Sequence, residues 1–111
     1  MDWTAELART NANIAAFRKA GPESAAGFAA MGKAAMGPGA LGVKEKELIC
    51  LAIGIVRQCT DCIGFHVKAA IAAGASREEI AETISVTIYM GGGPAYMNGV
   101  KALEAYDQLA G

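Results

Sequence analysis

Large aromatic side chains and strong charge are both scarce in this 111-residue chain. Aromatic residues make up 6% of it, and the formal net charge is -1. No basic patch with interleaved aromatic residues exists, which argues against nucleic-acid binding. The longest apolar run, residues 48–56, is too short to cross a bilayer, so we expect no membrane contact. The amino-terminal residues lack the pattern of a secretory signal, and we expect a cytoplasmic protein.

Small residues take the place of aromatic ones. Hydrophobic residues make up 53% of the chain, and 24 of them are alanine. The chain also has 14 glycines. Small side chains let helices approach closely, but each buries little apolar area. We therefore expect the chain to share its core with further copies of itself, as a homo-oligomer. Its length indicates a single domain over residues 1–111.

Glycine and proline positions divide the chain into about six helices, so we predict an all-α fold. The expected helices are approximately residues 3–20, 22–36, 44–56, 59–73, 77–90 and 94–109. Residues 76–79, SREE, form a capping box that opens the fifth helix. This signal outweighs the β-branched residues of 83–88, which are the only hint of a strand. Residues 48–56 are apolar on every side, so we expect them to be buried all round.

Apolar side chains elsewhere are interpreted as packing residues. One stripe runs along the first helix, another runs along the fifth, and a third group flanks the glycine-rich segment 91–94. The residues are Trp3, Leu7, Ile14 and Phe17, then Ile80, Ile84 and Ile88, then Tyr89, Met90, Tyr96 and Met97. The two stripes are expected to face the core or a subunit interface.

The segment 59–66, CTDCIGFH, concentrates the chemistry of the sequence, since it holds two of three cysteines and the only histidine. On a helix, Cys59, Cys62 and His66 lie within a 60° arc on one face. A helix amino terminus and a neighbouring imidazole both lower the pKa of a thiol, which makes it a better nucleophile. Asp61 falls on the opposite face, where we expect it to be exposed and to favour the start of the helix.

A histidine that acts as a base needs a second group to fix its tautomer. Glu47 is the preferred partner of His66, because a carboxylate in an otherwise apolar helix needs compensation. It shares a stripe with Cys50 and Gly54, and the glycine would let the neighbouring helix come close. Glu45 is the competing acid, but it lies nearer the start of the helix. Cys50 has no evident partner in the sequence and is interpreted as a packing residue.

A metal site is the alternative interpretation of the same residues. Cys59, Cys62 and His66 supply three possible zinc ligands, and Glu47 could be a fourth. Structural zinc sites usually draw ligands from two separate segments, whereas three of these come from a single helical face. We therefore expect neither a metal nor a cofactor.

The pattern Glu-x11-Cys-x2-Cys-x3-His, formed by Glu47, Cys59, Cys62 and His66, resembles the alkylhydroperoxidase D/carboxymuconolactone decarboxylase family. The segments 65–82 and 91–95 are also similar to that family, and the resemblance covers roughly residues 25–110. It implies an all-helical homo-trimer or homo-hexamer. It also implies a peroxidase that reduces hydroperoxides through a Glu–His–Cys proton relay and a redox-active disulfide. The reductant would be a lipoylated or thioredoxin-like dithiol protein.

Two features depart from the family pattern. Well-known peroxidase members carry a histidine directly before the second cysteine, where this chain has Asp61. A disulfide oxidoreductase or redox sensor with weak peroxidase activity is therefore an alternative. Family members that act as lactone decarboxylases generally lack the CxxC motif, so a lyase ranks last. Within the peroxidase hypothesis, contact with His66 favours Cys62 as the attacking residue, although the sequence leaves the order of the two cysteines open.

Overall fold

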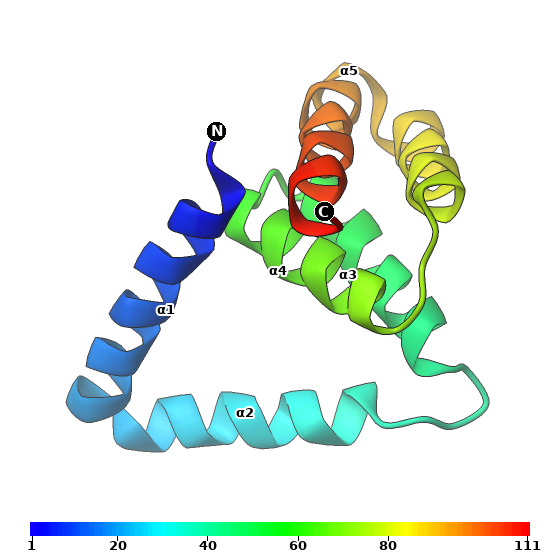
Figure 1. The fold of residues 1–111 in the computed structure, drawn as a ribbon. Helices are drawn as coiled ribbons and strands as arrows, with labels where there is room; N and C mark the ends of the chain where they lie inside the picture. The colour runs from blue at the N-terminus through cyan, green and yellow to red at the C-terminus, as the bar shows by residue number, and fades with distance from the viewer.

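The computed structural model describes residues 1–111 and contains five helices and no strand (Figure 1). They are α1 (Trp3–Ala20), α2 (Pro22–Met36), α3 (Val43–Val56), α4 (Thr60–Ala72) and α5 (Arg77–Leu109). The all-α prediction is confirmed. The sixth predicted helix is the second half of α5, which changes direction sharply at Gly92 (Figure 1). Gly92 has a φ of 71°, a left-handed conformation that glycine adopts readily.

Local signals set the ends of the helices. The Asp2 carboxylate accepts a hydrogen bond from the Ala5 N–H at 3.0 Å and caps α1. Ser76 and Glu79 form the predicted capping box at the start of α5, and residues 83–88 are helical. Gly74 follows α4 with a φ of 94°, as expected for a glycine that ends a helix.

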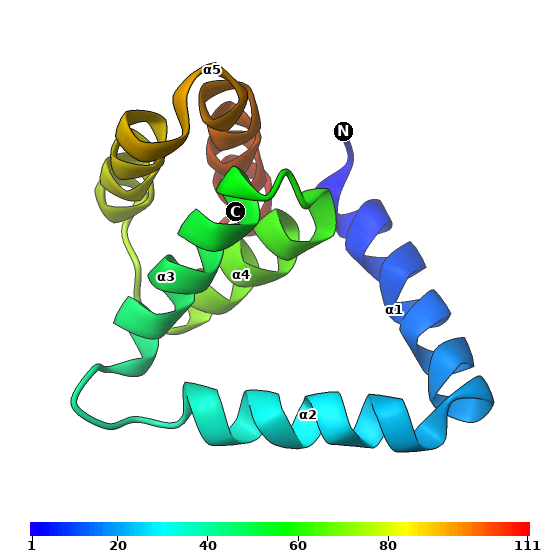
Figure 2. The same ribbon diagram turned by 180° about the vertical axis from the view of Figure 1, so that it is seen from behind.

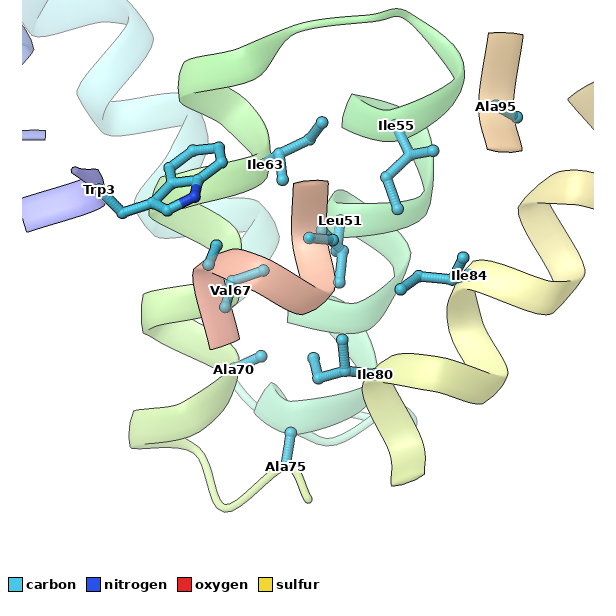
Figure 3. Close-up of a cluster of buried hydrophobic side chains, with 12 residues drawn as sticks. Trp3, Leu51, Ile55, Ile63, Val67, Ala70, Ala75, Ile80, Ile84 and Ala95 are labelled. Atoms are coloured by element: carbon cyan, nitrogen blue, oxygen red, sulfur yellow. The ribbon is translucent and has the colours of Figure 1, made fainter. Parts of the chain in front are cut away.

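The core lies between α3, α4 and α5, with the first turn of α1 added to it (Figure 3). Figure 3 shows Trp3 beside Ile63 and Val67 of α4. Trp3 is fully buried, and its indole Nε1–H donates a hydrogen bond to Glu104 Oε1 at 2.7 Å. A methyl group on Gly64 would lie 2.8 Å from the Trp3 ring, so this glycine allows the close approach of α1. The start of α1 is thereby fixed to α4.

Beyond its first two turns, α1 leaves the core, and α1 and α2 form two sides of an open triangle (Figures 1 and 2). The α1 stripe is therefore buried only at Trp3 and Leu7, while Ile14 and Phe17 are exposed. Helix α2 has no buried residue. None of the five helices combines the length and apolar character needed to cross a membrane.

Two packing predictions are wrong for the single chain. Residues 48–56 are not buried all round, because α4 and α5 cover one side of α3 and leave Ile49, Ile53 and Val56 exposed by 46%, 54% and 44%. The group flanking 91–94 does not pack either, since Tyr89, Met90, Tyr96 and Met97 are all at least half exposed. The stripe of Ile80, Ile84 and Ile88 does face the core.

Candidate functional site

The candidate site lies where the end of α3 meets the start of α4. The connection is tight: Gln58 has a positive φ of 58°, and the Cys59 N–H donates to the Gly54 carbonyl at 3.0 Å. A methyl group on Gly54 would lie 3.1 Å from Cys62 Cβ. The glycine therefore lets the first turn of α4 pack directly against α3, as its position in the sequence predicted.

Cys59 and Cys62 form a disulfide, with their Cα atoms 5.2 Å apart. Cys59 is also the N-cap of α4, and its Sγ accepts a hydrogen bond from the Cys62 N–H at 3.2 Å. A sulfur atom thus occupies the place where helices usually have a hydroxyl or carboxylate oxygen. The amino terminus of the helix stabilises negative charge that develops on this sulfur.

Glu47, which is buried, and His66, which is partly exposed, form a pair beside the disulfide. Glu47 Oε2 lies 2.7 Å from His66 Nδ1, and the Glu47 residue is 9% exposed. Against a carboxylate, which only accepts hydrogen bonds, Nδ1 is the donor of this contact, and Nε2 is then the ring nitrogen that can take up a proton. Glu45 is exposed and contacts Gly42 instead. The structure therefore brings Glu47, and not its competitor, to the histidine.

A cavity of about 340 Å³ opens beside the disulfide. It is lined by Cys50, Ile53, Gly54, Arg57, Cys59, Cys62 and His66. Both disulfide cysteines and the histidine therefore line one cavity, and Glu47 contacts His66 without lining it. Arg57, the C-cap of α3, gives the cavity one cation.

Cys50 is not the isolated packing residue that we expected. One donor atom each from Glu47, Cys50 and His66 lie within 4.8 Å of one another. The Cys50 Sγ also contacts Met36 Sδ at 3.7 Å. Burial raises the pKa of the Cys50 thiol, and the nearby Glu47 carboxylate raises it further. The sequence carried a signal for this arrangement, because the i,i+3 spacing of Glu47 and Cys50 places both side chains on one face of α3.

Asp61 is not exposed as predicted, because the start of α1 covers it. Its Oδ1 is buried without a hydrogen-bond partner, and the carboxyl group faces Glu6 and Thr10 of α1. Burial raises the pKa of Asp61, and the neighbouring Glu6 carboxyl adds to that rise. Asp61 does not line the cavity, so His66 is the only histidine or carboxylate that does.

The fold and the site together define the class of the protein, an all-helical protein with a CxxC disulfide beside a Glu–His pair. The chain belongs to the carboxymuconolactone decarboxylase family, whose model matches residues 22–105. The predicted family is thereby confirmed. An uncharacterized protein of Cupriavidus necator is 37% identical over 108 residues, covering 97% of this chain and 96% of the relative.

Two crystal structures of family members share the fold. A protein of Legionella pneumophila superposes with a TM-score of 0.95 at 39% identity, covering 98% of this chain and 97% of that one. A protein of Thermotoga maritima has a TM-score of 0.84 at 28% identity, covering 95% and 90% of the two chains. Involvement in the antioxidative response has been suggested for the Thermotoga protein.

Proposed function

We propose that the protein is a dithiol peroxidase that reduces hydroperoxides through Glu47, His66, Cys62 and Cys59. The observation that supports this most directly is the 2.7 Å Glu47–His66 contact beside a cavity lined by both cysteines. A carboxylate that holds the imidazole and a base that faces a thiol are the two elements needed to activate a nucleophilic sulfur. The antioxidative role suggested for the Thermotoga relative fits the same chemistry.

In the reduced protein, His66 takes the proton of the Cys62 thiol while Glu47 stabilises the resulting imidazolium. The Cys62 thiolate attacks one peroxide oxygen, the O–O bond breaks, and the alcohol leaves with a proton from His66. Cys62 is then a sulfenic acid. The Cys59 sulfur attacks it, water leaves, and the Cys59–Cys62 disulfide forms. The hydroperoxide is reduced by two electrons, and the two thiols supply them.

An external dithiol must then restore both thiols, and no cofactor takes part. We propose that its first thiol gives its proton to His66 and attacks Cys59, so that Cys62 leaves and takes that proton. The second thiol of the reductant then attacks the mixed disulfide, and Cys59 leaves with the proton of that thiol. A lipoylated or thioredoxin-like protein has the required chemistry. Arg57 lines the same cavity and would favour an anionic group beside the disulfide.

Turnover of an alkyl hydroperoxide with dihydrolipoamide tests the proposal. We expect catalytic consumption by the wild type and none by Cys62→Ser. Cys59→Ser should react once with the peroxide and then accumulate an unresolved sulfenic acid, which a dimedone label would detect by mass. A wild type that forms one disulfide per chain but does not turn over would contradict a peroxidase function.

A disulfide oxidoreductase or redox sensor is the second candidate. It is favoured by the orientation of Asp61, which faces α1 and contributes no second base to the cavity. Such a protein would exchange its disulfide rapidly with a partner dithiol and react slowly with peroxide. Stopped-flow kinetics separate the two candidates by measuring the oxidation of the dithiol by peroxide and the reduction of the disulfide by a partner dithiol. A peroxidase should carry out both reactions at comparable rates, whereas a sensor or oxidoreductase should be slow in the first.

A further inference from the structure

The third cysteine gives the cavity a set of donor atoms that the proposed peroxidase reaction does not use. Glu47, Cys50 and His66 bring a carboxylate oxygen, a sulfur and an imidazole nitrogen within 4.8 Å of one another. They come from two neighbouring helices, α3 and α4, so their spacing is held by the packing of the core. Cys59 and Cys62 are joined to each other, and neither offers a thiolate in this state.

The geometry and the donor types suit zinc. Atoms bound to a tetrahedral zinc ion lie about 3.3–3.8 Å apart, given bonds of about 2.0–2.3 Å. Small side-chain rotations would bring the three donors to this spacing, with Glu47 Oε2 and His66 Nδ1 moving apart from their present 2.7 Å. Sulfur, imidazole and carboxylate are the three ligand types that zinc takes in proteins. Magnesium and calcium prefer several oxygen ligands, and this cluster offers a single carboxylate. The adjoining cavity leaves room for water at the fourth position.

We infer that the disulfide form of the protein binds one zinc ion through Glu47, Cys50 and His66. Binding releases the Cys50 thiol proton to solvent. The His66 proton moves from Nδ1 to Nε2, and Nδ1 binds the ion through its lone pair. The ion replaces the proton that Glu47 and His66 share across 2.7 Å. Zinc therefore occupies the groups that would otherwise act on the Cys62 sulfur. This inference concerns metal binding and does not depend on peroxidase activity.

The unaltered chain allows a direct test, because Cys50 is its only free cysteine when the disulfide is formed. Alkylation of the oxidised protein by iodoacetamide therefore reports on Cys50 alone. One equivalent of zinc should slow this reaction at least about tenfold, since a metal-bound thiolate is no longer a free nucleophile. Magnesium should leave the rate unchanged, and a chelator should restore it. An unchanged rate with zinc would overturn the inference.

Cobalt provides a second readout, because a thiolate bound to Co²⁺ gives a charge-transfer absorption band. The band should appear in oxidised wild type and in the double variant Cys59→Ser/Cys62→Ser, where Cys50 is the only thiol left. It should vanish in Cys50→Ser, and Glu47→Gln should weaken cobalt binding about 10- to 100-fold. A band that survives in Cys50→Ser would place the metal elsewhere. Circular dichroism melting shows that each variant is folded before the comparison.

Discussion

Replacement of Glu47 by glutamine keeps the size and one acceptor oxygen of the side chain but removes its charge. A hydrogen bond to a charged group contributes about 1.5–3 kcal/mol, against about 0.5–1.5 kcal/mol for a neutral one. Loss of the charge next to a developing His66 imidazolium should therefore raise the barrier by roughly 1–2 kcal/mol. At 1.36 kcal/mol for each factor of ten, the rate of disulfide formation should fall about 5- to 30-fold.

The assay is the rate of Cys59–Cys62 disulfide formation with a hydroperoxide under single-turnover conditions, which excludes the reductant. Glu45→Gln is the matched control, since Glu45 lies two residues away, is exposed and does not contact His66. It should change the rate less than twofold. Because His66 is the only histidine, its ¹⁵N signals are unambiguous and report which ring nitrogen carries the proton. Equal rates for the two variants, with an unchanged tautomer, would refute the relay.

Three further predictions concern packing, assembly and pH. Gly54→Ala should lower the free energy of unfolding in urea by about 1–3 kcal/mol, because the new methyl group would meet Cys62 Cβ at 3.1 Å. Gly27 has open space around it, so Gly27→Ala should raise the free energy of unfolding by up to about 1 kcal/mol. Equal effects of the two substitutions would contradict the close packing of Gly54 against Cys62. Phe28 is 80% exposed in the single chain and should lie in the interface of the predicted homo-oligomer. Phe28→Asp should therefore dissociate the oligomer, as measured by sedimentation velocity. A monomeric wild type would contradict this prediction. Burial raises the pKa of Asp61, so ionisation of this group lowers the stability of the fold as the pH rises above its ordinary pKa of 3.8. Asp61→Asn should therefore raise the free energy of unfolding at pH 7 by about 1 kcal/mol, and this gain should shrink on acidification. A gain that does not depend on pH would contradict the prediction.

Helix boundaries could be predicted from the sequence because they depend on local chemistry. The hydroxyl of Ser76, the carboxylate of Asp2 and the freedom of Gly74 to adopt a positive φ act within one turn of the residues they affect. The count of helices was less certain at 91–94. There, Gly92 leaves the helical conformation, so the break predicted at 91–94 is a kink with helix on either side of it.

Burial could not be predicted from local pattern, because it depends on which faces find a neighbour. Ile53 and Leu51 lie two residues apart in the same apolar run, yet Leu51 is fully buried and Ile53 is 54% exposed. Cys50 was missed for a related reason. Its partners include a histidine of α4 that only the packing of α3 against α4 brings close, whereas the sequence shows only its apolar neighbours.

The direction of Asp61 determines how many groups can move protons at the disulfide. Successive residues on a helix point about 100° apart, so Asp61 cannot share the face that Cys62 presents to the cavity. The start of α1 covers the face where Asp61 lies, and the Asp61 carboxyl faces Glu6 and Thr10 there. In the proposed reaction, proton transfer at the cysteines therefore rests on His66 and on the Glu47 carboxylate next to it. A change at Glu47 reaches the only imidazole in the cavity, whereas a change at Asp61 alters the packing of α1, so the two substitutions should separate an effect on chemistry from an effect on stability.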